Sequence, residues 1–326
     1  MSLISYAQNS EDIILWRALK SVEAGFYVDV GANDPHHMSV TKLFYEKGWR
    51  GINLDPIPQW FEKLVTARPR DINLQVGASD TSGELLIYEF ADTGLSTFDH
   101  EAAERNRKEH GFSYTTRTVA TERLSDICSR HHDGPIHFLK IDVEGAEEQV
   151  LKGLDLQSIR PWIILVESTL PLTQIESHSK WESQLVSSNY HFVYFDGLNR
   201  FYLATEHGDL AHSFRTPPNI FDGFRTCETI ALEQRILTLE ADNRSLQTQI
   251  EQQAAETARL VQREAHIQQV NSEYHEALQS SAAKLAVANE ELATQSAALQ
   301  SVLQSRSWRI TAPLRLLSRL FHRKNS

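Results

Sequence analysis

The chain has 326 residues and a formal net charge of -11, and an acidic chain is not expected to bind nucleic acid. Its two cysteines, Cys128 and Cys227, exclude a disulfide framework and favour a reducing compartment. The sequence has no apolar run of about 18 residues and no long apolar segment near its first residues. We therefore expect a cytoplasmic protein without a transmembrane helix or a signal peptide.

The composition changes near residue 227. All 14 glycines lie at or before Gly223, and a single proline, Pro313, follows residue 227. Glycine and proline interrupt helices, so their loss indicates a long helix. The whole negative net charge lies in residues 1–227, because acids and bases balance in the remainder. We predict three parts: a globular domain (1–227), a helical coiled coil (228–304) and a basic amphipathic segment (305–326).

In the first part, strand-like segments alternate with segments that have the pattern of amphipathic helices. Helices are expected at residues 11–20, 39–48, 58–67, 145–154 and 180–188. Strands are expected at residues 26–30, 51–55, 72–77, 84–90, 136–142 and 162–168. Asp196–Gly197 lies between two further strand-like runs, which predicts a hairpin over residues 190–204. The alternation predicts an α/β fold, with a doubly wound, mostly parallel sheet and an antiparallel hairpin at its edge.

The first of these strands ends in an unusual turn, FYVDVGAND (residues 26–34). Ligands of open α/β sheets bind at the carboxyl ends of the strands. Gly31 has no Cβ and lets the backbone pass close to a ligand, and Asp29 precedes it inside the strand end. The alternative is a tight turn beside a buried, hydrogen-bonded Asp29.

The next two strand ends indicate a nucleoside site. Asp55 follows Gly31 by 24 positions, a spacing that suits the hydroxyls of a ribose. The third strand ends in VGASD (76–80), where small residues leave room for a base and Asp80 could bind its amino group. NAD would require G-x-G-x-x-G, whereas this turn has one glycine followed by an acid and a proline. S-adenosylmethionine has no phosphate and carries cationic groups that Asp29 and Asp34 could accept.

Four blocks of the chain resemble the FkbM-type S-adenosylmethionine-dependent methyltransferases. They are SYAQNSEDIIL (5–15), the segment 26–58, VGASD (76–80) and LKIDVEGAEEQVLKGLD (139–155). The resemblance covers about residues 5–205. It implies a Rossmann-like methyltransferase fold, S-adenosylmethionine as cofactor and O-methylation of sugar, polysaccharide or polyketide hydroxyls, often in bacterial surface-glycan synthesis.

The resemblance also implies roles for individual residues. Asp55 would hold the ribose, and Asp142 would face the transferred methyl group. Other residues would line the two ends of the cofactor: Asp29, Gly31 and Asn33 the methionine, and Ser79 and Asp80 the adenine. We assign no residue to a metal, since a Mg²⁺ ion at Asp142 rests on analogy with other O-methyltransferases alone.

A sugar hydroxyl is a weak nucleophile, so a general base is expected near the strand ends. The candidates are Asp142, Glu144 and His37, with Glu167 as a further contact for the substrate. Each has a structural alternative: Glu144 could favour the first turn of the next helix, and His36–His37 could cap the helix after them. The polar insertion 92–119 is expected to cover the acceptor, or else to be a surface excursion. Residues 206–226 are a linker or a second loop on the acceptor side.

The helical part has leucines in a heptad frame. Leu232, Leu239 and Leu246 are followed in the same frame by Leu260, Ile267 and Tyr274, and then the frame jumps by four residues to Leu278, Leu285, Leu292 and Leu299. We interpret the jump as a stutter in a coiled coil. The alternative is a solvated helix packed on its own domain.

The end of the chain is basic, with six Lys or Arg and no acid in residues 306–326. Its apolar residues are Trp308, Ile310, Leu314, Leu317, Leu320 and Phe321. This pattern is typical of a segment that meets an anionic membrane surface or a protein partner, and the alternative is a cap on the coiled coil.

Together, these features predict an S-adenosylmethionine-dependent O-methyltransferase that acts on a sugar hydroxyl of a bacterial glycan or glycan precursor. We expect a homo-oligomer formed through the coiled coil, held by its C-terminus at the cytoplasmic face of the inner membrane or on a glycan-assembly partner. The alternative from another class is a non-catalytic assembly protein of a glycan-synthesis complex. A nicotinamide-dependent oxidoreductase is disfavoured because the second and third glycines are missing.

Overall fold

The structure is a computed structural model that describes residues 3–315. The chain divides into two compact units, Met1–Arg235 and Ile236–Ser326. We describe each unit by itself. The helix that continues into the second unit begins at Cys227, close to the change in composition.

The first unit is built on a seven-stranded sheet with the strand order β10-β11-β9-β8-β2-β3-β4. Its strands are β2 (Phe26–Val30), β3 (Arg50–Leu54), β4 (Ile72–Leu74), β8 (Phe138–Ile141), β9 (Ile163–Glu167), β10 (Tyr190–Phe195) and β11 (Asn199–Ala204). The pairs from β4 to β9 are parallel, and β11 is antiparallel to both of its neighbours. The predicted mixed α/β fold with a mostly parallel sheet is confirmed, as is the hairpin at the edge. The chain runs from β2 to β3 on one side and later returns to β8 on the other, so the strand order reverses at β2.

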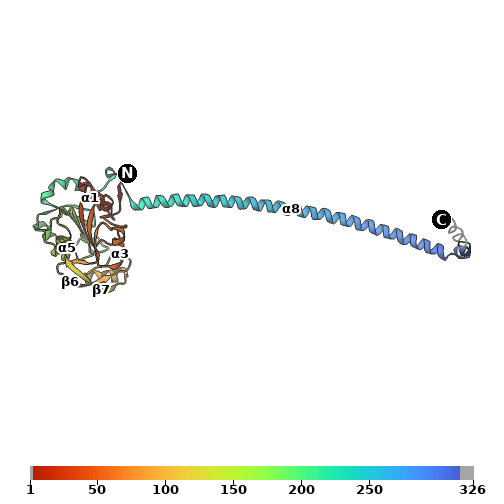
Figure 1. Ribbon diagram of the computed structural model, residues 1–326, viewed down its shortest axis with the longest axis horizontal. Helices are drawn as coiled ribbons and strands as arrows, with labels where there is room; N and C mark the ends of the chain where they lie inside the picture. The colour runs from red at the N-terminus through yellow and green to blue at the C-terminus, as the bar shows by residue number, and fades with distance from the viewer. Residues whose placement is uncertain (1–2, 316–326) are drawn as a thin grey trace. The chain divides into compact units, whose positions relative to one another are not determined.

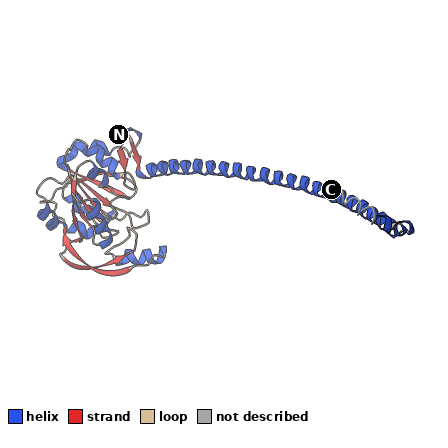
Figure 2. Cartoon of the chain, turned by 45° about the vertical axis from the view of Figure 1, so that its right-hand side comes forward, coloured by secondary structure: helices blue, strands red, loops and turns tan. Residues whose placement is uncertain are grey.

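Helices cover both faces of this sheet (Figure 2). Successive side chains of a strand point to opposite faces, and in β9 Ile163 and Leu165 enter one core while Ile164 and Val166 enter the other. One core includes α1 (Glu11–Leu19) and α2 (Lys42–Glu46). The opposite core includes α5 (Leu124–His131), α6 (Glu147–Lys152) and α7 (Glu182–Ser187), which follows the short 3₁₀ helix η1 (His178–Lys180). Helix α3 (Pro58–Ala67) begins with a proline and buries Trp60 and Leu64.

A second sheet of three strands was not predicted as such. It has the order β5-β7-β6, with β5 (Gly77–Ser79), β6 (Gly83–Glu89) and β7 (Thr115–Arg123) (Figure 1). The expected strand 72–77 therefore ends at Leu74, and Gly77 already belongs to the other sheet. The insertion 92–119 contains α4 (His100–His110) and the first half of β7. Most residues of β7 are exposed, so the strand lacks the apolar alternation by which it could have been predicted.

Two predicted helices are shorter in the structure because left-handed residues precede them. Met38 has a φ of 53°, and the helix expected over residues 39–48 is reduced to α2. Glu144 and Gly145 have φ values of 54° and 105°, and α6 begins only at Glu147. Both turns lie directly after central strands, where they shape the loops at the carboxyl edge of the sheet.

Residues 206–226 pack against the first helix. Most of them lie in the 3₁₀ helices η2 (Thr205–Phe214) and η3 (Ile220–Asp222) and in β12 (Phe224–Thr226), which pairs in parallel with β1 (Leu3–Ser5). Arg17 of α1 binds both carboxylate oxygens of Asp222 and donates to the carbonyl oxygens of Ser213 and Thr216. This segment is therefore fastened to α1 and contributes no residue to the cavity described below.

Helix α8 (Cys227–Gln304) is continuous and has no buried residue. A short helix, α9 (Arg306–Ile310), follows it. Within residues 3–315, no helix combines the length and the hydropathy needed to cross a membrane. Leu317, Leu320 and Phe321 of the predicted amphipathic segment lie outside the described residues.

The buried Glu11 gives a prediction for the pH dependence of stability. Its carboxylate accepts hydrogen bonds from the Asn9 backbone and the Asn199 side chain, and burial together with Asp196 raises its pKa to about 8. A raised carboxyl pKa means that the folded state binds more protons than the unfolded state. The contribution of Glu11 to stability is therefore fully present below about pH 4.5 and is lost as the pH rises to about 8.

We expect Glu11→Gln, which cannot ionise, to lose less unfolding free energy between pH 5 and pH 8 than the wild type. The difference should be on the order of a few kcal/mol. Urea denaturation at several pH values measures it, with Glu62→Gln on the exposed face of α3 as the control. Equal pH slopes for the wild type and Glu11→Gln would contradict this account.

Candidate functional site

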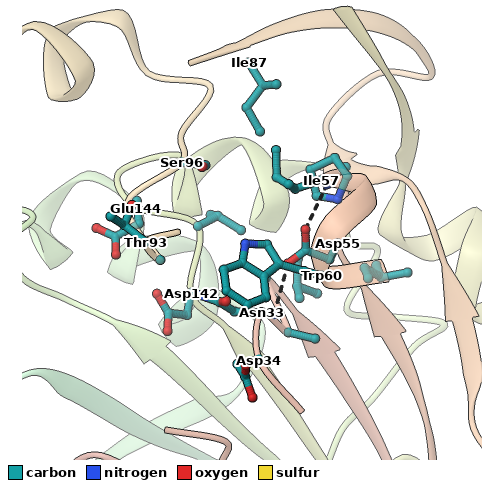
Figure 3. A pocket seen from close by; sticks show the side chains of 18 of the residues that line it. Asn33, Asp34, Asp55, Ile57, Trp60, Ile87, Thr93, Ser96, Asp142 and Glu144 are labelled. Carbon is teal, nitrogen blue, oxygen red and sulfur yellow. Dashed lines mark hydrogen bonds between the residues drawn. The ribbon is translucent and has the colours of Figure 1, made fainter. Parts of the chain in front are cut away.

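A cavity of about 370 Å³ opens at the carboxyl ends of β2 and β3, which is a volume typical of small-molecule sites. Loops that follow β2, β3 and β8 line it, together with β5 and the loop 92–98 (Figure 3). It therefore lies where the strand order reverses, as expected for a ligand site of an open α/β sheet.

Gly31 allows two of these loops to meet. Its φ is +77°, and a Cβ built on it would lie 1.9 Å from the carbonyl oxygen of Asp142. The amides of Gly31 and Ala32 donate to the carbonyl oxygen of Leu54 at 3.0 and 3.1 Å. The loops after β2, β3 and β8 thus converge at a residue that must be glycine, and Gly31 lines the cavity as predicted.

Asp55 lies at the end of β3 and is 5% exposed. Its carboxylate accepts hydrogen bonds from the backbone amides of Asn33 at 3.0 Å and Ile57 at 2.9 Å (Figure 3). Burial raises its pKa to about 6, and these two amides act against that rise. Asn33 and Asp55, both predicted, line the cavity, and the carboxylate keeps unused lone pairs for a ligand.

The cavity has an apolar end that was not predicted. Trp60 presents its indole ring there (Figure 3). It comes from the first turn of α3, whose start is set by Pro58. The other apolar side chains at this end are those of Ile57, Ile87 and Phe98, which pack in one cluster with Trp60, and Val76 and Ala78 also line the cavity. The sequence feature that could have indicated Trp60 was PQW (residues 58–60), which follows soon after Asp55 at the end of the predicted strand.

Three residues predicted to bind the cofactor do not line the cavity. Asp29 is 1% exposed and accepts a hydrogen bond from the Thr41 hydroxyl at 2.9 Å. It shares the face of Tyr27 in β2, which points into the core on the α1 and α2 side. Ser79 is buried in β5, and Asp80 is exposed. The cavity is instead lined by Gly77 and Ala78, which precede Ser79 and Asp80 by two residues.

Lys140 links Asp29 to the cavity. Its ammonium lies 3.1 Å from the Gly31 carbonyl oxygen, 3.3 Å from Asp29 Oδ1 and 3.2 Å from Asp142 Oδ2. Burial alone would lower the pKa of Lys140, but Asp142 and Asp29 raise it above its usual value. The side chain is therefore a fixed positive charge at the strand order reversal.

One end of the cavity is acidic. Asp142 and Glu144, two predicted base candidates, line it, and Glu167 lies against them at the end of β9. Burial and the neighbouring acids raise the pKa values of Glu144 and Glu167 well above their usual range. Glu147 stabilises the turn that precedes α6, because its carboxylate accepts hydrogen bonds from the amides of Val143 and Gly145.

His37, the third base candidate, is exposed and lies at the rim of the cavity. Asp34 holds this turn, since its carboxylate accepts hydrogen bonds from the amides of His36 and His37. Asp34 also forms an ion pair of 3.1 Å with Lys63 of α3. The rim is completed by the loop 92–98, which belongs to the insertion that was expected to cover the acceptor.

The arrangement can hold an elongated ligand with a flat apolar part, a central pair of hydroxyls and a polar end. Comparison with family models gives a match to the methyltransferase FkbM domain over residues 29–194, just over half of the chain. A comparison with curated proteins gives no match. The matched segment contains the last two residues of β2 and all of β3, β8 and β9, with the loops that follow them.

The contact at Gly31 predicts a large effect of a single methyl group. We expect Gly31→Ala to lower the free energy of unfolding by about 1–3 kcal/mol, because the positive φ and the Asp142 carbonyl oxygen both oppose a Cβ. Gly208→Ala is the matched control, since a Cβ there meets no atom within 4 Å. Urea denaturation of both variants measures the difference, and an equal stability would show that the loops do not meet as described.

Proposed function

We propose, on the premise that this chain belongs to the FkbM methyltransferase family, that it methylates a sugar hydroxyl of a glycan or glycan precursor. The proposed methyl donor is S-adenosylmethionine. The observation that carries the proposal is the buried carboxylate of Asp55 in a cavity that also presents the indole ring of Trp60 and the acidic side chains of Asp142 and Glu144.

The cavity lining offers a partner for each part of S-adenosylmethionine. Asp55 has free lone pairs for the two ribose hydroxyls. Trp60 and Phe98 offer aromatic surface for the adenine at one side. At the other side, Asn33 and the backbone at Gly31 adjoin the acidic end, where a carboxylate would favour a cationic amino group and sulfonium. When bound, the cofactor supplies an electrophilic methyl group.

The residues of the acidic end would then act on the acceptor. Glu144 has a raised pKa and is therefore more often protonated, and a protonated carboxyl group cannot accept the proton of the acceptor. Asp142, which forms an ion pair with Lys140, is the carboxylate candidate for the general base. His37 at the rim is the other candidate. Most of the rate enhancement would come from alignment of the acceptor oxygen with the methyl carbon, since the leaving thioether needs no proton.

A sugar acceptor is supported by the polar rim. Asp92, Thr93 and Ser96 come from one loop and line the cavity, and Figure 3 shows Thr93 and Ser96. Hydroxyl and carboxylate groups are suited to hydrogen bonds with several hydroxyls of a sugar. The assignment to a bacterial surface polysaccharide rests on the family resemblance.

Helix α8 would join two copies of the chain. The two runs of leucines fit one heptad frame, because Leu278 follows Tyr274 by the four residues that separate a d position from the next a position. On this assignment no stutter is needed. Asn243 and Asn271 fall on a positions, where asparagine favours a parallel dimer.

A non-catalytic assembly protein is the second candidate, and the length of α8, 78 residues without a buried side chain, favours it. Its C-terminal basic segment would then hold the chain on a membrane surface or a glycan-assembly partner. In the described part of that segment, Arg315 lies over the Trp308 ring at 3.5 Å. For both candidate functions, we propose that the protein is located at the cytoplasmic face of the inner membrane.

Titration of S-adenosylhomocysteine into the full chain tests the cofactor site. We expect binding that weakens by at least about tenfold in Asp55→Asn, because hydrogen bonds to a charged group are lost. Asp126→Asn on the exposed side of α5 is the control and should bind like the wild type. Circular dichroism shows whether each variant is folded. No binding by a folded wild type would favour the assembly protein.

Light scattering after size exclusion tests the dimer. We expect two copies per particle for the wild type and one for Leu239→Asp/Leu246→Asp, since charges at two d positions would lie in the helix interface. Ala241→Asp/Thr248→Asp, each two residues further on, changes outward f positions and should remain dimeric. A monomeric wild type, or a dimer that survives the d-position changes, would contradict the proposal.

A further inference from the structure

The acidic end of the cavity has an excess of negative groups. Asp142, Glu144 and Glu167 lie together, and Glu147 lies close enough to raise the pKa values of Glu144 and Glu167. In the described part of the chain, Lys140 is the one cation that forms an ion pair with any of them, and it also neutralises Asp29. Buried charges are paired or bind a metal, so this group needs further positive charge.

Two of these carboxylates also have oxygen atoms without a partner. Glu167 is 7% exposed, and its buried Oε2 accepts no hydrogen bond from the described residues. The buried Oε2 of Glu144 has none from them either. A buried polar atom without a hydrogen bond costs about 1–3 kcal/mol, which makes two such atoms in one cluster a sign of a missing ligand.

The three carboxylates converge on one point. Asp142, Glu144 and Glu167 each offer an oxygen, and these oxygens lie within 4.8 Å of one another. Oxygens on opposite sides of an octahedral Mg²⁺ are about 4 Å apart, and those around Ca²⁺ about 5 Å. A small inward movement would thus bring all three into the coordination sphere of one ion.

We propose that Asp142, Glu144 and Glu167 form a site for one hard divalent cation, such as Mg²⁺ or Mn²⁺. Carboxylate oxygens are the ligands that these ions prefer. Water would complete the coordination on the side of the cavity, because Asp142 and Glu144 line it. Glu147 is not a ligand, since its Oε1 is already bound to the amides of Val143 and Gly145.

The competing explanation is that protons neutralise the cluster. One proton shared between Glu167 and Asp142 would satisfy Glu167, but it would leave the Oε2 atom of Glu144 without a partner. A cation satisfies all three carboxylates at once. Its role for the acceptor rests on the proposed function: an ion at this place could bind the acceptor hydroxyl and lower the pKa of that hydroxyl.

Titration of the full chain with Mn²⁺, followed by electron paramagnetic resonance of the free ion, tests the site without any activity measurement. We expect one Mn²⁺ per chain in the wild type and at least about tenfold weaker binding in Glu167→Gln, which keeps the shape of the side chain. Glu148→Gln is the matched control, because Glu148 is on α6 but pairs with Lys152 outside the cluster. It should bind Mn²⁺ like the wild type.

Thermal unfolding with and without Mn²⁺ keeps the test valid if a variant changes stability. Mn²⁺ should raise the melting temperature of the wild type and of Glu148→Gln, but not that of Glu167→Gln. No binding to a folded wild type, or equal binding by Glu167→Gln, would overturn the proposal in favour of protons. S-adenosylhomocysteine binding by the same samples separates the two proposals, since a chain that binds it but no Mn²⁺ would be a metal-independent methyltransferase.

Discussion

The site depends on the interactions of the Lys140 ammonium group. It joins the carbonyl oxygen of Gly31 to the carboxylates of Asp29 and Asp142, and so fastens β2 to β8 where the strand order reverses. The close approach of Gly31 to Asp142 needs both a residue without a Cβ and a charge that holds the two loops together. Asp29 therefore acts through Lys140, below the cavity, and positions the residues that line it.

Some of the residues predicted from the sequence line the cavity and others do not. Gly31 and Asp55 could be predicted because their chemistry depends on their place at a strand end, which the sequence shows directly. The direction of Asp29 could not, because β2 is buried on both faces and its pattern does not reveal which face a residue occupies. Trp60 escaped prediction because an aromatic residue in a helix more often packs in a core than lines a cavity.

The small sheet was missed for a different reason. The residues of β7 are mostly polar and exposed, so the strand is formed by pairing with β5 and β6 rather than by burial of an apolar face. Its partner β5 carries Gly77 and Ala78 to the cavity, whereas Ser79 and Asp80, which were expected beside the base, do not line it. Long-range pairing of this kind leaves little trace in local sequence. In α8, by contrast, the apolar repeat is local and the helix follows it closely.

The proposed function predicts that a nucleoside lies across the strand ends, with its ribose on Asp55 and its reactive end beside Asp142. A crystal structure of the full chain with S-adenosylhomocysteine tests this claim most directly. We predict electron density in the cavity, with both ribose hydroxyls within hydrogen-bonding distance of the Asp55 carboxylate and the base against Trp60. A ligand bound elsewhere, or one whose ribose does not contact Asp55, would contradict the account.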